Sequence, residues 1–338
     1  MRVRLVNSNV ILEAAPDEPL LETALRASLN LPHSCRGGNC GACRARLLAG
    51  EIHYPNGPPL GLSAAETAEG FVLLCQAYPR SDLTLETLTR DTPDRIRTKR
   101  LPARIERSVH LSHDVMGLYL KLPAAEPFDF EAGQYLDILL PGGRRRSYSM
   151  ASPPQGSRLP RLPEPRLPEP RLLELHVRRV EGGAFSAPLF EEGARNTLLS
   201  IEGPLGQFMY HPGTAPMLLI GGGTGIAPLL SIARHVTLNR LKRRFRIYWG
   251  VRSERDLYAH DALEALGGYI PVLSEPSDIW AGRRGWVHEA VLKEVADLPC
   301  HEIYAAGPPA MIAAVLRDFA LAGVASERLY VDSFDYCG

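Results

Sequence analysis

Four cysteines near the start of the chain are spaced as ligands of a metal centre. Cys35, Cys40 and Cys43 follow the pattern C-x4-C-x2-C, and Cys75 stands well downstream. This is the ligand pattern of plant-type [2Fe–2S] clusters, which take four thiolates, two for each iron. Glycines between the first three cysteines let the backbone wrap closely around inorganic sulfide, with amides pointing at the sulfurs. The spacing therefore predicts a redox cluster.

Two other uses of four cysteines compete with this interpretation. A structural zinc site also takes four thiolates, but it usually pairs its ligands at short spacing on both sides, and here Cys75 is alone. Disulfides fit a cytosolic chain poorly, because thiols there are kept reduced. Zinc stays open as the alternative, and it would imply a different protein: a zinc-containing nucleotide-binding sensor without electron transfer.

The segments around the cysteines resemble a known domain. Residues 32–47, PHSCRGGNCGACRARL, and residues 73–79, LLCQAYP, are similar to plant-type ferredoxin domains fused to bacterial reductases. The resemblance implies an α+β ferredoxin domain of the β-grasp type, in which the four cysteines hold a [2Fe–2S] cluster.

A second pattern, R-x-Y-S, is formed by Arg146, Ser147, Tyr148 and Ser149. It resembles a flavin-binding motif of the ferredoxin–NADP reductase superfamily, and its position between a ferredoxin segment and a nucleotide segment favours that function over a chance match. The resemblance implies that Arg146 binds a flavin phosphate, that Tyr148 packs on the flavin, and that Ser149 hydrogen-bonds near its reactive nitrogen. Ser149 is the candidate catalytic residue. Side chains alternate along a strand, so Arg146 and Tyr148 can serve one ligand.

Neighbouring segments extend this resemblance. Glu131–Tyr135 is similar to the strand before the motif, and Leu175–Arg178 to the strand after it, whose backbone usually meets the flavin ring. Residues 182–186 are similar to the loop and helix start that hold the flavin phosphates, where unpaired N–H groups and the helix dipole favour an anion. The FAD contacts implied here are His176, Val177, Gly182, Gly183 and Ser186.

A glycine-rich segment, Ile220–Pro228, follows a buried-strand signal and opens a helix. Glycines let the backbone approach a pyrophosphate, and the helix N-terminus supplies N–H donors. A P-loop is excluded because no Lys-Ser/Thr pair follows the glycines. The segment resembles the GGGTGIAP element of the same superfamily. The nucleotide contacts implied are Gly222, Gly223, Thr224 and Gly225.

Two later segments belong to the same resemblance. Tyr248–Arg252 and the loop after it are similar to the second strand, where the adenosine ribose lies, which implies a role for Arg252. Residues 306–311 resemble the family's C-G-P-P-x-M element, which implies nucleotide contacts at Gly307, Pro308 and Met311. Ala306 stands where a cysteine is common, so no thiol chemistry is assigned there.

Two details stay open at this level. Phe334, near the C-terminus, either covers the flavin face, as a terminal aromatic does in relatives, or packs within a C-terminal tail. The segment Ser253–Asp256 mixes acidic and basic residues, and an acidic residue suits a ribose hydroxyl whereas Arg252 or Arg255 would suit a phosphate. We expect NADH, with NADPH as the alternative.

Hydrophobic periodicity predicts the elements that position these residues. The N-terminal part shows strands near 3–5 and 10–12, a helix over 18–28, a strand over 45–48 and then a loop rich in Pro and Gly. Strand signals follow at 103–106, 115–122, 134–140, 146–151, 172–180 and 197–202. From residue 216, strands at 217–220, 245–251, 269–273 and 302–306 alternate with helical stretches, of which 227–237 is the clearest.

These signals predict a multidomain protein. The expected parts are a ferredoxin domain (1–90), a linker (91–101), an antiparallel β-barrel FAD domain (102–208) and an α/β parallel-sheet NAD(P)-binding domain (209–338). A tandem Pro-rich repeat, Arg161–Pro165 and Arg166–Pro170, is expected to form a solvated insertion at about 157–171, without a function of its own.

Composition limits the classes of partner. The chain has 338 residues and a formal net charge of zero, which argues against nucleic acid. No stretch approaches the roughly 18 consecutive apolar residues of a membrane span. The N-terminus lacks the apolar core of a signal peptide. We expect a cytoplasmic protein, and a monomer like many relatives.

Together the segments predict an electron path from nicotinamide to FAD, to the cluster and then to an external protein. A hydride donor gives two electrons and a [2Fe–2S] cluster carries one, so a flavin is needed between them. The whole chain resembles the reductase components of bacterial multicomponent systems. Relatives serve dioxygenases, monooxygenases and a deoxysugar dehydrase, which implies a terminal oxygenase, a dehydrase or another acceptor protein as partner.

Overall fold

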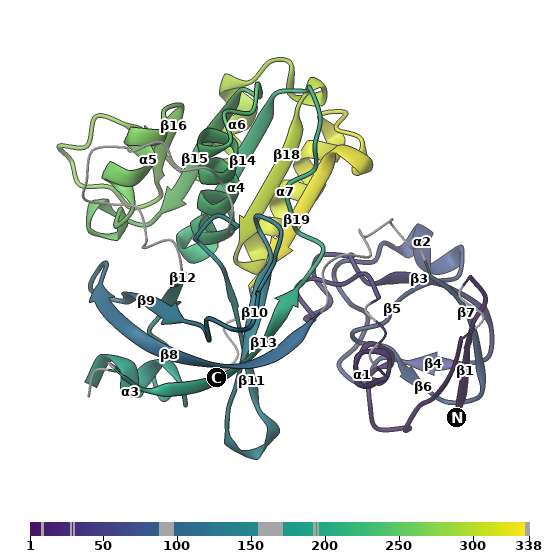
Figure 1. The fold of residues 1–338 in the computed structure, drawn as a ribbon. Helices are drawn as coiled ribbons and strands as arrows, with labels where there is room; N and C mark the ends of the chain where they lie inside the picture. The colour runs from purple at the N-terminus through teal and green to yellow at the C-terminus, as the bar shows by residue number, and fades with distance from the viewer. Residues whose placement is uncertain are drawn as a thin grey trace. The chain divides into compact units, whose positions relative to one another are not determined.

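The computed structural model describes residues 1–7, 10–27, 29, 31–87, 98–154, 172–191, 194 and 196–334 (Figure 1). The chain divides into two compact units: an N-terminal one, which also includes residues 332–334, and a larger one formed by the residues between them. The Pro-rich repeat, Cys337 and most of the expected linker lie outside the described residues.

The N-terminal unit is a five-stranded sheet with the order β2-β1-β7-β3-β5. β1 pairs antiparallel with β2 and parallel with β7, as in a β-grasp fold. Leu21 and Ala24 of α1, both fully buried, pack in its core with Leu73 and Leu85. The elements are β1 (Arg2–Leu5), β2 (Val10–Glu13), α1 (Leu20–Arg26), β3 (Arg44–Ala49), β4 (Ile52–His53), α2 (Ala64–Ala68), β5 (Phe71–Leu73), β6 (Tyr78–Pro79) and β7 (Leu83–Thr87).

Two expectations for this unit need correction. The helix begins at Leu20 rather than Glu18, because Pro19 is extended and restricts the residue before it. The stretch after β3, expected as a loop, contains α2 and four strands. β4, β5 and β6 have two or three residues each, too few to show a period of two. β7 alternates buried and half-buried residues, and this signal was missed.

The second unit begins with a six-stranded antiparallel sheet of order β11-β10-β13-β8-β9-β12. A bridge between Met150 and Leu175 joins its outer strands, so the sheet closes into the predicted barrel. Its elements are β8 (Lys99–His110), β9 (Val115–Lys121), β10 (Tyr135–Leu139), β11 (Arg145–Ser149), β12 (Leu172–Arg178), α3 (Ser186–Glu191) and β13 (Leu198–Leu205).

The first barrel strand starts earlier than expected. Lys99 and Arg100 belong to β8, whereas the sequence placed them in the linker. Leu101, Ala103 and Ile105 point into the barrel core, while Pro102 and Arg104 between them are exposed. Lys99 and Arg100 are both basic, so the start of this alternation was not recognisable from the sequence.

The remainder of the second unit is a sheet of order β17-β16-β15-β14-β18-β19, and its described pairs from β17 to β18 are parallel. α4 packs against α5, and α6 packs against α7. This is the predicted α/β architecture. The elements are β14 (Met217–Gly222), α4 (Ile226–Leu238), β15 (Phe245–Val251), α5 (His260–Leu266), β16 (Tyr269–Leu273), β17 (Arg283–Arg284), α6 (Val287–Glu294), β18 (Glu302–Gly307), α7 (Pro309–Leu321) and β19 (Leu329–Ser333).

None of the helices in the described part of the chain combines the length and the apolar character that crossing a bilayer would require.

A polar stripe on the outer face of β12 fastens the barrel to the α/β part of the second unit. Leu173, Leu175 and Val177 point into the barrel, so the residues between them point out. Arg234 of α4 donates to Glu174 Oε2 at 2.5 Å and to the carbonyl of Ala151 at 2.9 Å.

In the buried ion pair of Glu174 and Arg234, each charge is compensated by the other. Burial by itself would raise the pKa of Glu174, but the Arg234 guanidinium and the His176 ring together hold that pKa well below its ordinary value. A carboxylate stabilised in this way keeps its charge in the interior and supports the barrel–helix contact.

We predict that Glu174→Gln lowers the free energy of unfolding of the larger unit by about 3 kcal/mol, because it leaves Arg234 buried without a counter-charge. The folded pKa of Glu174 lies below the unfolded one, so its contribution is fully present above about pH 4.5 and is lost as the pH falls further. Thermal melts between pH 7 and pH 3 check this. The gap between parent and variant should stay constant down to about pH 5 and then narrow, and a gap that widens with acid would contradict it.

Candidate functional site

The cysteine loop has a tightly wound backbone. Arg36, Gly38 and Gly41 take positive φ values of 52°, 78° and 71°. A Cβ on Gly38 would lie 2.9 Å from Gln76 and 3.0 Å from Pro59, so only glycine lets these segments meet. The Gln76 side chain donates to the carbonyl of Arg36 at 2.9 Å and ties the segment after β5 to the loop.

The four thiols form two pairs. Cys35 contacts Cys40, and Cys43 contacts Cys75, which is brought there because the amide of Leu74 donates to the carbonyl of Cys43 at 3.1 Å. Two pairs of sulfurs are what a two-iron cluster needs, whereas tetrahedral zinc draws four sulfurs to one point.

The loop backbone favours the thiolate form of Cys35. The hydrogen bond with the Cys40 thiol is the largest cause and the amides of Asn39 and Cys40 add to it, so the pKa of Cys35 falls to about 6 in spite of burial. Both amides lie 3.4 Å from Cys35 Sγ. A thiolate is the form that binds metal.

On β11, the pairing with β10 places Arg146 opposite Ile138 and Tyr148 opposite Leu136, so the two predicted flavin residues share a face. The Tyr148 ring packs 5.6 Å from the Phe185 ring, centroid to centroid. Ser147, on the opposite face, donates its hydroxyl to Asp137 at 2.7 Å.

Ser149 is the most informative residue of this strand. Its side chain is buried, and its Oγ has no hydrogen-bond partner in the part of the chain that the structure describes. Buried hydroxyls are nearly always satisfied, so such an atom marks a place where a ligand can donate or accept. This fits the predicted role of Ser149 beside a flavin.

The predicted phosphate loop lies between β12 and α3. Gly182 has a φ of 66°, and a Cβ on Gly183 would lie 2.6 Å from Ser186 Oγ. The Ser186 hydroxyl accepts from the amide of Val180 at 3.0 Å. Ser186 therefore shapes the turn with its side chain.

The glycine-rich segment forms a tight turn between β14 and α4. Gly223 has a φ of 54°, and its carbonyl accepts from the Trp249 indole at 2.8 Å. A Cβ on Gly222 would lie 2.5 Å from Met311 Sδ, and one on Gly225 would lie 2.1 Å from the carbonyl oxygen of Ala306. The carboxyl ends of β14 and β18 approach each other as closely as a backbone allows.

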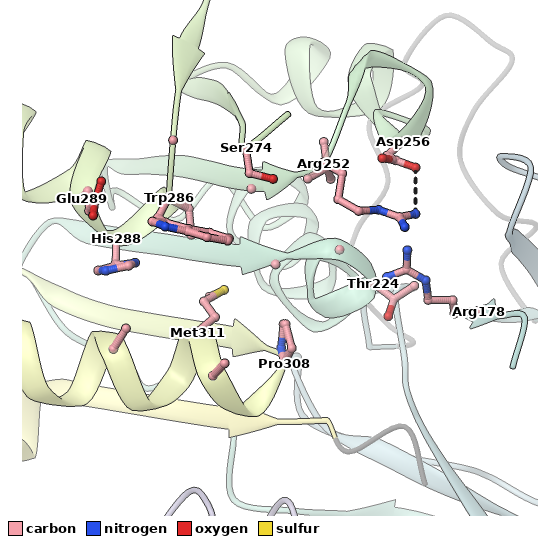
Figure 2. Close-up of a pocket in the computed structure, with 18 of the residues that line it drawn as sticks. Arg178, Thr224, Arg252, Asp256, Ser274, Trp286, His288, Glu289, Pro308 and Met311 are labelled. Atoms are coloured by element: carbon pink, nitrogen blue, oxygen red, sulfur yellow. Dashed lines mark hydrogen bonds and ion pairs between the residues drawn. The ribbon is translucent and has the colours of Figure 1, made fainter. Parts of the chain in front are cut away.

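These strand ends open into a cavity of about 630 Å³ (Figure 2). β14 lies between β15 and β18, so the cavity is at the point where the order of the parallel strands reverses, the usual place for a nucleotide. Of the predicted nucleotide residues, Gly222, Gly223, Thr224, Arg252, Pro308 and Met311 line it, whereas Gly225 and Gly307 are not among the lining residues.

Barrel residues line the same cavity. Asp114, before β9, accepts from Arg178 Nε and Nη2 at 3.0 and 2.8 Å, and it lies 3.4 Å from Arg252 Nη2. Asp256 lies 3.5 Å from Arg252 on the other side. In Figure 2 the guanidinium groups of Arg178 and Arg252 lie beside Thr224 at one end of the cavity.

His176 connects the end of the cavity near Arg178 to the buried ion pair of Glu174 and Arg234. One ring nitrogen lies 3.1 Å from the Tyr258 hydroxyl and the other 3.1 Å from Glu174 Oε1. Val177, by contrast, packs its side chain in the barrel core and offers only its backbone to a ligand. Phe334 follows β19 and is half-buried.

Sequence reasoning missed the residues at the end of the cavity opposite Arg178 and Arg252. Trp286, 62% exposed at the start of α6, lines the cavity with His288, and Figure 2 shows the indole across from Met311. A tryptophan directly after a glycine, Gly285, is the one signal that the sequence offered. Asp114 gave no signal, because its role depends on contacts between distant segments, whereas Tyr258 belongs to the loop, Asp256–Tyr258, whose resemblance to the adenosine site was part of the sequence prediction.

Comparison with known proteins agrees with this geometry. The model of the 2Fe-2S iron-sulfur cluster binding domain matches residues 3–80, and that of the oxidoreductase NAD-binding domain matches residues 219–317. The first match supports the cluster and leaves the zinc alternative without support.

Full-length relatives are reductases. CDP-6-deoxy-L-threo-D-glycero-4-hexulose-3-dehydrase reductase of Yersinia pestis is 32% identical over 99% of this chain and 98% of its own length. The reductase subunit of an aromatic O-demethylase of Amycolatopsis is 36% identical over 96% of both chains. The crystal structure of an Amycolatopsis cytochrome P450 reductase has a TM-score of 0.74 at 33% identity, with 99% of this chain and 98% of that chain covered.

The cofactors follow from these matches and from the fit of the residues: a [2Fe–2S] cluster, FAD and a nicotinamide nucleotide. The chain belongs to the family of NAD(P)H-dependent iron–sulfur flavoprotein reductases, in which a plant-type [2Fe–2S] domain precedes a ferredoxin–NADP reductase-like module.

Proposed function

We propose that this chain is the NADH-dependent reductase component of a multicomponent enzyme system and serves a terminal oxygenase or a dehydrase. The observation that carries the proposal is the shared cavity. The glycine turns after β14 and β18 and the barrel residues Asp114, Val115 and Arg178 line one space, so a nucleotide bound there reaches the barrel that holds the flavin.

The proposed roles follow the predicted residues. The four cysteines hold the cluster; Arg146, Tyr148 and Ser149 bind FAD with the turn at 182–186; and the glycines at 222–225 with Arg252, Pro308 and Met311 bind the nucleotide. Bound FAD supplies the exchange between a two-electron donor and a one-electron carrier. The domains we propose are a ferredoxin domain over 1–90, an FAD domain that runs from the start of β8 at Lys99 to 208, and a nucleotide domain over 209–338.

The preference for NADH rests on charge. Arg252 is the basic residue at the end of β15, and Asp114 and Asp256 flank it at 3.4 and 3.5 Å. Glu254 accepts a hydrogen bond from the amide of Ser277 at 3.1 Å. With two carboxylates beside its guanidinium, Arg252 offers little net positive charge to a 2′-phosphate.

The acceptor is inferred from the relatives. One serves a deoxysugar dehydrase and another an aromatic O-demethylase, as their names state. Propane and xylene/toluene monooxygenases have similar reductase components. We propose an oxygenase or a dehydrase for this chain, and a monomer working in the cytoplasm.

Anaerobic reconstitution with iron, sulfide and FAD tests the proposal. NADH should bleach both the flavin and the iron–sulfur absorbance and should support reduction of ferricyanide and cytochrome c. Cys75→Ser should retain FAD and ferricyanide reduction but lose the cluster bands and most cytochrome c reduction, whereas Cys300→Ser, at an exposed free cysteine, should match the parent. A parent protein that binds neither group, or that NADH leaves oxidised, would refute the function.

We predict that Ser149→Ala slows flavin reduction by NADH about tenfold, since one hydrogen bond is worth about 1 kcal/mol or slightly more. Stopped-flow absorbance of the FAD-loaded protein measures it. Ser200→Ala is the matched control, because Ser200 lies on β13 and accepts from Arg100 instead. An unchanged rate in Ser149→Ala would remove this serine from the flavin site.

We predict that Trp286→Ala raises KM for NADH about fivefold with little change in kcat, because the indole offers a stacking face for an aromatic base. Trp286→Phe should restore most of the affinity. Titration with ADP-ribose, followed by tryptophan fluorescence, gives a reading independent of turnover. A lower kcat with an unchanged KM would contradict a binding role.

A further inference from the structure

One exposed apolar residue lies beside the cluster-binding loop. The side chain of Leu60 is 78% exposed, and what distinguishes it from other exposed apolar side chains is its place next to that loop. It belongs to the Leu60 loop, residues 54–62, between β4 and α2. The wider stretch from Ile52 to Ala65 contains no Asp, Glu, Lys or Arg.

The Leu60 loop packs directly on the cysteine loop. The amide of Gly61 donates to the carbonyl of Gly38 at 2.8 Å, and a Cβ on Gly61 would lie 2.8 Å from the backbone of Asn39. Leu60 is therefore one residue from a backbone contact with the segment between Cys35 and Cys40. No other described segment combines such exposure with contact to the cluster loop.

The Leu60 loop is held in place at both ends. The Tyr54 hydroxyl accepts from the amide of Leu73 at 3.1 Å, and the Ser63 side chain caps α2 in a reciprocal pair with Glu66. Pro55, Pro58 and Pro59 restrict its backbone further. A surface already ordered loses little entropy when a partner binds.

Charges around the cysteine loop are balanced. Arg36 lies 3.7 Å from Glu22, and Arg44 lies 2.7 Å from Glu66. Each basic group that flanks the loop has an acidic neighbour, so this face has little net field with which to steer a charged protein.

We propose that the Leu60 loop is the surface on which the external electron acceptor docks, and that the acceptor presents an apolar, weakly charged face around its own redox centre. The inference rests on the proposed function. In each encounter one electron passes from the cluster to the redox centre of the acceptor, and no bond forms or breaks. Brief redox encounters use small interfaces, which a single exposed leucine on a rigid loop suits.

A charged probe can locate this surface before the acceptor is known. Cytochrome c is strongly cationic, but a docking face without net charge would neither attract nor repel it. We therefore expect the holoenzyme to reduce it at a rate that changes little between about 20 and about 300 mM salt, a range over which surface charges go from weakly to strongly screened. Leu60→Asp should raise the low-salt rate about threefold and make it fall with salt, and Leu60→Lys should lower it by a similar factor.

Ile11 supplies the matched control. It is also exposed and apolar, but it lies on β2, at the opposite edge of the sheet from β5 and the cysteine that follows it. Ile11→Asp and Ile11→Lys should leave the cytochrome c rate as in the parent.

Other results would overturn the inference. Equal cytochrome c rates in Leu60→Asp, Leu60→Lys and the parent would exclude the Leu60 loop as the exit, and so would a change confined to reduction of the cluster by NADH. A parent rate that falls steeply with salt would exclude an uncharged docking face. Failure of the proposed function is distinguishable, because it would appear in the parent as a loss of bleaching by NADH.

Discussion

The interaction on which the larger unit depends is the buried ion pair between Glu174 and Arg234. It joins a barrel strand to the helix that begins at the glycine-rich turn, and neither charge can stay buried without the other. His176 and Arg178, on the same face of β12, continue the contact through Tyr258 and Asp114. The cavity has walls from the barrel and from the sheet because this stripe holds the two together.

Close backbone approach is the second constraint, and it occurs at both redox-related sites. Gly222 and Gly225 let the ends of β14 and β18 meet, and Gly38 and Gly61 let two loops meet at the cluster. Any larger residue would add a Cβ within 3 Å of its neighbours. The space for a ligand is thus created by the absence of side chains rather than by their chemistry.

The family resemblance and the hydrophobic periodicity located most of the fold. Most strands of five or more residues with a buried face, such as β14 and β15, were found within a few residues of their ends, but β7 and β19 were missed. The failures have local causes: β4, β5 and β6 are too short to show a period, and Lys99 and Arg100 concealed the start of β8. The cysteines and the glycine turn were evident because their chemistry depends on spacing along the chain.

By itself, the sequence determined the cofactor classes, since the ligands of a cluster and the glycines of a nucleotide turn lie within short segments. Only the tertiary structure decided which residues share a space. Asp114 and Arg252 are far apart in the chain and 3.4 Å apart in the fold, and Trp286 faces Met311 across the cavity. Local spacing records chemistry that one loop performs, whereas contacts between strands and helices depend on packing, which no single segment encodes.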